Sequence, residues 1–100
     1  MDPLTFTAEL WVWEAKQPST GWIFVTVPDE FTEEILMLGG PSKGFGSVRV
    51  EVTVGDQTWR TSVFPESGRG FVLPIKASVR RHVGVEAGDS VDVTLRVIGA

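Results

Sequence analysis

Residues 45–64, FGSVRVEVTVGDQTWRTSVF, alternate apolar and polar side chains on both sides of the pair Gly55-Asp56. Such alternation has the two-residue period of a β-strand, and a Gly-Asp pair between two strands is typical of a two-residue hairpin turn. Pairing outward from this turn sets Glu51 directly opposite Arg60. The core face of the predicted hairpin carries Val48, Val50, Val52, Trp59 and Val63, and the outer face carries Arg49, Glu51, Thr53, Arg60 and Ser62.

Four other segments have strand patterns: residues 4–14, 21–27, 71–75 and 91–97. The first and last alternate strictly, and the second, GWIFVTV, is rich in β-branched and aromatic residues. We expect 4–14 and 21–27 to pair antiparallel. Pro74 cannot donate a ladder hydrogen bond, so 71–75 should be short or lie at an edge. Together with the hairpin, these segments predict six strands.

Two short helices are predicted between the strands. The first follows Pro28, with Asp29 expected to cap it by accepting a backbone N–H. The second spans residues 76–83 and ends at Gly84, which suits a left-handed C-cap. Residues 86–89 fit a type II turn, because glycine at the third position supplies the positive φ. The apolar stripe of the first helix consists of Phe31, Ile35 and Leu38.

Length and composition predict one domain, residues 1–100. The chain has 42% hydrophobic and 22% charged residues, which is ordinary globular usage, and it has no cysteine for disulfides or sulfur-ligated metals. Residues 1–14 are too acidic for a signal peptide and no run is long enough for a membrane span, so we expect a cytoplasmic protein without a membrane. The predicted fold class is mainly β: a six-stranded barrel with two short helices over its ends. An open sheet with helices on one face is the alternative.

Four segments resemble, in order and spacing, a bacterial family called domain of unknown function 1905. They are GWIFVTVP (21–28), FGSVRVEVTVGDQTWRTSVFP (45–65), GFVLPIKASVRRHVGV (70–85) and GDSVDVTLRV (88–97). The resemblance covers about residues 4–97. It implies a double-split β-barrel capped at both ends by helices, the architecture of the AbrB-like transition-state regulators. It implies no activity, because the family has none established.

No catalytic, cofactor or metal site is predicted. Residues 40–44, GPSKG, match the G-x-S-x-G pattern of hydrolase nucleophiles, but a helix precedes them and a strand follows, the reverse of that elbow. The single histidine, His82, falls in the last turn of a helix, where a partial positive charge is favourable. The acidic residues near the start of the first helix are explained by the helix dipole. They are Glu30, Glu33 and Glu34.

Two sets of side chains are candidates for a partner or ligand surface. Trp11, Trp13 and Trp22, with Phe24, form an aromatic set that either packs under a helix or lines a ligand cavity or partner interface. A basic set either faces solvent or contacts an anion or nucleic acid. It consists of Lys76, Arg80 and Arg81 on the second helix, joined by Arg49.

Three functions fit these observations. The first is a non-catalytic binding or interaction module that docks a protein partner or a second copy of itself. The second is an AbrB-like DNA-binding regulator, which requires a dimer that concentrates the basic set against a net charge of -4. The third is a small-molecule-binding or enzymatic barrel with the aromatic set as its pocket. Because no catalytic set of residues is recognised in the sequence, we favour the first function, a non-catalytic binding module.

Overall fold

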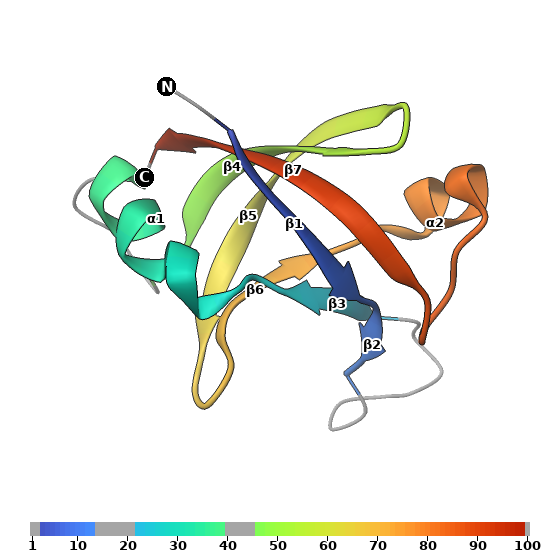
Figure 1. Ribbon diagram of the computed structural model, residues 1–100, viewed down its shortest axis with the longest axis horizontal. Helices are drawn as coiled ribbons and strands as arrows, with labels where there is room; N and C mark the ends of the chain where they lie inside the picture. Colours follow the sequence, from blue (N-terminus) through green and yellow to red (C-terminus); the bar gives the residue numbers. More distant parts are fainter. Residues whose placement is uncertain (1–2, 14–21, 40–45, 100) are drawn as a thin grey trace.

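The computed structural model describes residues 3–13, 22–39 and 46–99, which form seven strands and two α-helices around one core (Figure 1). In chain order the strands are β1 (Leu4–Glu9), β2 (Trp11–Val12), β3 (Ile23–Thr26), β4 (Val48–Val54), β5 (Gln57–Glu66), β6 (Gly70–Pro74) and β7 (Ser90–Gly99). The helices are α1 (Thr32–Gly39), which follows the 3₁₀ turn η2 (Asp29–Phe31), and α2 (Ala77–Val83).

Two long extended segments divide their pairing between two antiparallel sheets. Strand β5 pairs with β4 through residues 57–63 and with β6 through residues 64–66. The first segment of the chain does the same, since β1 pairs with β7 and β2 pairs with β3. The strand order β1-β7-β4-β5-β6-β3-β2 therefore begins and ends on one stretch of chain, which nearly closes the barrel. This is the split-barrel arrangement that the family resemblance implies.

Leu10 is the point at which the first segment changes partners. Its N–H donates to the carbonyl of Asp89 at 2.8 Å, and its own carbonyl accepts from the N–H of Gly88 at 2.9 Å. Its side chain is 1% exposed and belongs to the core. The alternation of side chains continues through this residue, so the sequence predicts one strand where the structure has two. The prediction of six strands is corrected to seven for this reason.

The barrel interior is filled by the alternating apolar residues of the strands. Each buried aliphatic side chain removes apolar surface from water, worth roughly 1.5–3 kcal/mol, and this term dominates the stability of the fold. The predicted inward faces of β4 and β7 are confirmed. Their buried residues are Val48, Val50, Val52, Val54, Val91, Val93, Leu95 and Val97.

The predicted hairpin is confirmed in every pair of its register. Val52 lies opposite Trp59 and Glu51 opposite Arg60, and Gly55 has a positive φ of 60° in the turn. The guanidinium Nε of Arg60 is 3.9 Å from a carboxylate oxygen of Glu51. Both side chains are exposed enough that this pair contributes less than about 1 kcal/mol. The hairpin is therefore stabilised mainly by its buried valine side chains and not by this ion pair.

The start of the first helix differs from the prediction. Asp29 makes no side-chain capping hydrogen bond; it lies inside the 3₁₀ turn, in which the N–H of Phe31 donates to the carbonyl of Pro28 at 3.0 Å. Pro28 fixes the chain direction here, so the turn forms from backbone bonds and the carboxylate stays exposed. The apolar stripe is confirmed: Ile35 is buried, and the ring of Phe31 packs 6.0 Å from that of Phe6.

The second helix and the turn after it match the prediction. Gly84 is left-handed, with φ 76°, and its N–H donates to the carbonyl of Arg80 at 2.9 Å. In the following turn Gly88 has φ 96°, and the N–H of Asp89 donates to the carbonyl of Glu86 at 3.0 Å. Helices α1 and α2 lie on opposite sides of the barrel (Figure 1). In the described residues neither helix has the length and apolar character needed to cross a membrane.

Candidate binding surface

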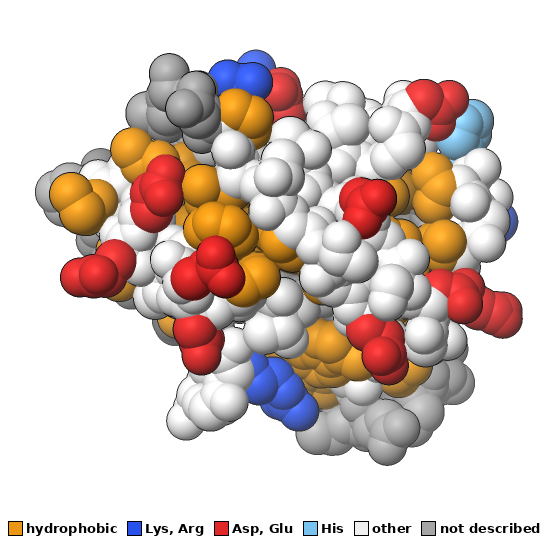
Figure 2. All heavy atoms as spheres, viewed as in Figure 1, with side chains coloured by type: hydrophobic (Ala, Val, Ile, Leu, Met, Phe, Trp, Pro, Cys, Tyr) orange, Lys and Arg blue, Asp and Glu red, His pale blue; other side chains and the backbone are white. Residues whose placement is uncertain are grey.

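An aromatic cluster lies on the outer side of β2 and β3, and we call its members Trp11, Trp13, Trp22 and Phe24 the aromatic face. Ile23 and Val25 of β3 point into the core, so the residues that alternate with them point outward. None of the four belongs to the core cluster. Figure 2 shows hydrophobic side chains reaching the surface over β2 and β3, at the lower edge of the view, beside a basic side chain.

Phe24 is the centre of this face. Its ring stacks on Trp11 at 5.3 Å and 26° and on Trp22 at 6.1 Å and 16°, while Trp13 approaches at 5.4 Å and 57°. Such ring pairs contribute about 0.5–1.5 kcal/mol each beyond the area that they bury. Phe24 is thereby only 8% exposed although it lies outside the core, whereas Trp22 is 57% exposed. The cluster is held together by its own contacts and leaves one indole open to solvent.

Arg69 lies over this face, and the sequence interpretation missed it. Its guanidinium carbon is 4.6 Å from the ring centroid of Trp11 and 5.4 Å from that of Trp13. It projects from the β5–β6 turn, in which the flanking Gly68 and Gly70 have φ values of 79° and 76°. An arginine between two turn glycines gives no sequence signal of its own, because its neighbours on β2 are far away in the chain. The pairing of β3 with β6 brings them together.

The two indole N–H groups under Arg69 are placed differently. Trp11 Nε1 donates to the hydroxyl oxygen of Thr26 at 3.0 Å. Trp13 Nε1 is buried and, among the described residues, is the one buried side-chain polar atom without a hydrogen-bond partner. A buried donor left without an acceptor costs about 1–3 kcal/mol. The aromatic face therefore contains an unmet hydrogen-bond donor beside a cation.

Three of the residues singled out in the sequence meet in one groove at the start of α2, which we call the α2 groove. Trp22 forms one wall, and Lys76 and Arg80 line it together with Pro74 and Ile75. Its volume is about 240 Å³, and none of the described residues that line it is acidic. Arg80 is fixed there, since its Nε donates to the carbonyl of Ile75 at 3.1 Å. The groove thus joins an exposed indole to two cations.

The remaining two basic candidates lie apart from this groove. Arg81 is exposed on α2 and does not line it. Arg49 is at the opposite end of β4 from α2, next to Val48, whose side chain lies against Gly39 of α1. Val83 of α2 packs against Gly55, at the other end of that strand. The structure therefore does not bring Arg49 together with the basic residues of α2.

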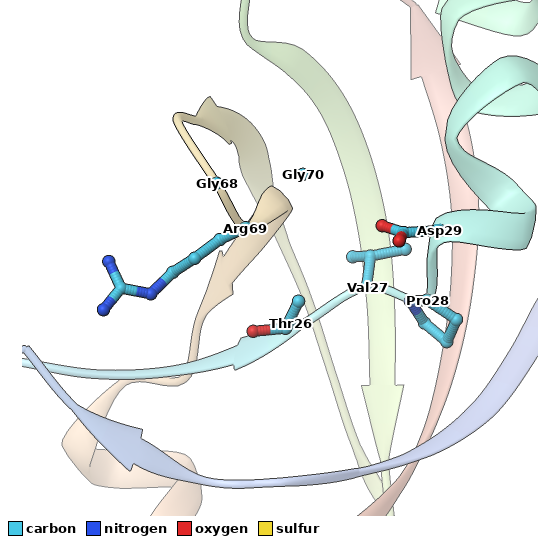
Figure 3. A pocket seen from close by; sticks show the side chains of 7 residues that line it. All are labelled: Thr26, Val27, Pro28, Asp29, Gly68, Arg69 and Gly70. Carbon is cyan, nitrogen blue, oxygen red and sulfur yellow. The ribbon is translucent and has the colours of Figure 1, made fainter.

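A second hollow, of about 530 Å³, lies between the β5–β6 turn and the start of η2. Figure 3 shows the Arg69 side chain extending away from Asp29, on the other side of Thr26. Gly68 and Gly70 form part of its wall without side chains. The hollow is open, and its charged groups come from two different elements.

His82 ties α2 to the hairpin turn. Its Nε2 is 3.2 Å from Asp56 Oδ1, and the hydrogen bond from His82 lowers the pKa of that exposed carboxyl, helped by Gln57. Both side chains are exposed, so the contact between His82 and Asp56 is a surface interaction. No group of three or more His, Asp or Glu side chains in the described ranges is arranged to hold a metal ion. The GPSKG segment lies outside the described residues.

Comparison with known proteins adds a family and no named relative. No curated protein matches the chain. The model of the family described as "Domain of unknown function (DUF1905)" matches residues 6–95. The match runs from β1 to β7 and so includes the aromatic face, Arg69 and the α2 groove. Because it spans most of the chain, this protein belongs to the DUF1905 family.

Proposed function

We propose that this protein is a non-catalytic binding module that docks an acidic, partly apolar segment of a partner protein on its aromatic face. One observation carries the proposal: three tryptophans gather around Phe24 outside the barrel core, with cations at both ends of the cluster. Tryptophan and arginine are the residues most enriched where protein interfaces derive their binding energy. A solvent-exposed indole at this position is open to a partner.

Charge complementarity favours an acidic segment. Arg69 covers one end of the aromatic face, and Lys76 and Arg80 line the groove at the other. Apolar side chains of the segment would pack on Trp22, and its carboxylates would meet the cations at either end. Rim charges of this kind steer encounter and fix orientation more than they add affinity.

The same charges disfavour two other occupants. A second copy docked through the identical face would set cations against cations, because a two-fold interface apposes one end of a patch with the other and both ends of this face carry cations. A nucleic-acid backbone carries a phosphate at every nucleotide and needs an extended basic surface, whereas Arg49 lies away from the α2 cations. We therefore propose a protein segment in preference to a homodimer or DNA.

The proposal is tested by selecting peptides from a random phage-displayed library on the immobilised protein. We expect the selected sequences to combine Asp or Glu with aromatic or aliphatic residues. A synthetic copy of the selected peptide should bind Trp22→Ala at least about tenfold more weakly than wild type by calorimetry, as for a hot-spot residue. Met37→Ala is the matched control, since Met37 is 80% exposed on α1 and should bind normally.

Two outcomes would contradict the proposal. Either no peptide is enriched above background, or the selected peptide binds Trp22→Ala as tightly as wild type. Sedimentation across micromolar concentrations supplies a further check, in which we expect a monomer. A dimer that Trp22→Ala abolishes would assign the aromatic face to a second copy instead.

A further inference from the structure

The guanidinium of Arg69 lies over two indole rings, with its carbon 4.6 Å from the ring centroid of Trp11 and 5.4 Å from that of Trp13. A guanidinium that packs on aromatic rings through its plane keeps its N–H donors pointing outward in that plane. Contacts with the ring faces use none of the Arg69 hydrogen-bond donors, which can therefore pair with an oxyanion. No described residue accepts a hydrogen bond from this guanidinium or forms an ion pair with it. Within the described part of the chain, the donors of this cation have no acceptor.

The surroundings of Arg69 offer further donors to an incoming anion. The Thr26 hydroxyl already accepts from Trp11, so its own hydrogen can be donated. Trp13, whose ring lies under the Arg69 guanidinium carbon, has a buried Nε1 without a partner, and this donor becomes available to an anion only if the indole moves outward. Gly68 and Gly70 have no side chains, which allows a ligand to approach the backbone of the turn closely.

We infer that Arg69 is the residue that binds a carboxylate of the docked segment, the side chain of an Asp or Glu, at the outer edge of its guanidinium over Trp11 and Trp13. This inference rests on the proposed function and adds the group that is recognised and the residue that recognises it. Figure 3 shows the Arg69 side chain extending away from Asp29, so the one carboxylate that lines the hollow with it does not occupy the guanidinium. Because the proposed occupant is a protein segment, its anionic side chains are carboxylates, which match the fork of guanidinium donors.

The contact of the Arg69 side chain with two indole rings explains why arginine suits this position better than lysine. A free arginine side chain loses rotamer freedom when it pairs with an anion, whereas one already stacked on two indoles has lost that freedom beforehand. Lysine would place a charge at the same site but has neither the planar face to stack nor the fork to pair. The Arg69→Lys variant should therefore keep the positive charge at this position but lose most of the affinity for the carboxylate.

The test follows the Arg69 Nε–H signal by NMR during titration with N-acetylglutamate amide, whose side-chain carboxylate is its one charge. N-acetylglutamine amide is the neutral control ligand, at matched ionic strength. We expect a saturable shift with the glutamate compound only, accompanied by shifts of the Trp11 and Trp13 indole signals. A shift that is absent, or equal for the two compounds, would overturn the inference, as would a stronger saturable response to inorganic phosphate.

Variants separate this inference from the proposed function. The peptide selected by phage display should bind Arg69→Gln at least about tenfold more weakly, and Arg69→Lys should be close to Arg69→Gln. Arg60→Gln, which removes an exposed arginine from the hairpin, should bind like wild type.

If the peptide binds Arg69→Gln normally but loses binding in Trp22→Ala, the inference fails and the proposed function stands. If no peptide is selected but the glutamate compound saturates Arg69, the proposed function fails. An unchanged Trp59 indole signal confirms that each variant is folded.

Discussion

The His82–Asp56 pair predicts a pH effect at one carboxyl. Because the folded protein lowers the pKa of Asp56, this group stabilises the fold above its unfolded pKa, about 3.9. The contribution is lost as the pH falls through the lower, folded value. His82→Ala should raise the pKa of Asp56 toward its ordinary range, measured by carbon-detected NMR titration of side-chain carboxyls. An unchanged Asp56 titration in this variant would show that the two side chains do not interact in solution.

The residues of the aromatic face differ in how well the sequence predicts them. Trp11, Trp13 and Trp22 stand out by their type and alternation, and the structure gathers them around Phe24. Arg69 does not stand out, because its role depends on a contact with residues more than half the chain away. Thr26 gives no signal in the sequence either, since its hydrogen bond to Trp11 depends on strand packing. The residues that complete the site are brought there by the fold.

At the scale of elements, the period of the side chains predicts each strand but not its partner. The alternation in residues 4–14 runs unbroken through Leu10, although β1 and β2 belong to different sheets. Strand β5 also changes partner after Val63, where the apolar run Val63-Phe64-Pro65 interrupts the alternation. In neither place does the local pattern indicate which strand is the new partner, because that depends on hydrogen bonds to distant carbonyls and amides.

Leu10→Ala tests how much the residue between β1 and β2, where the first segment changes sheets, contributes to the stability of the fold. The side chain is 1% exposed in the core, so truncation should lower the free energy of unfolding by about 2–5 kcal/mol, measured by urea denaturation. Glu9→Ala, one residue away on the exposed side, should change it by less than about 0.5 kcal/mol. Equal effects for the two variants would mean that Leu10 does not join the sheets through the core.

The β5–β6 turn should place Arg69 through the backbone of Gly70. Gly70→Ala and Gly84→Ala introduce a side chain at the same positive φ of 76°, so each should cost about 1–2 kcal/mol. At Gly70 the added Cβ would also lie 3.1 Å from an Asp29 carboxylate oxygen, while the space around Gly84 is open. Only Gly70→Ala should shift the Trp11 and Trp13 indole NMR signals. Unmoved indoles would show that the turn does not position Arg69.

At the scale of the whole molecule, the sequence predicts a barrel because six alternating segments need a shared interior. In the structure the barrel nearly closes because the first segment of the chain and β5 each pair with strands of both sheets. The second sheet then carries an apolar outer surface at β2 and β3, where an ordinary barrel would be polar. Period-two patterns assign Trp11 and Trp13 to the face opposite the core, but they do not reveal that rings from β2 and β3 stack there.

We propose that this outer aromatic face, and no other surface, receives the partner. The most direct measurement is an NMR titration with the selected acidic peptide, read at the ¹⁵N-indole signals of the tryptophans and at the ¹³C-methyl signal of Met37 on α1. We predict saturable shifts at Trp11, Trp13 and Trp22, with Met37 unmoved. Shifts at α1 while the three indoles stay in place would contradict the claim.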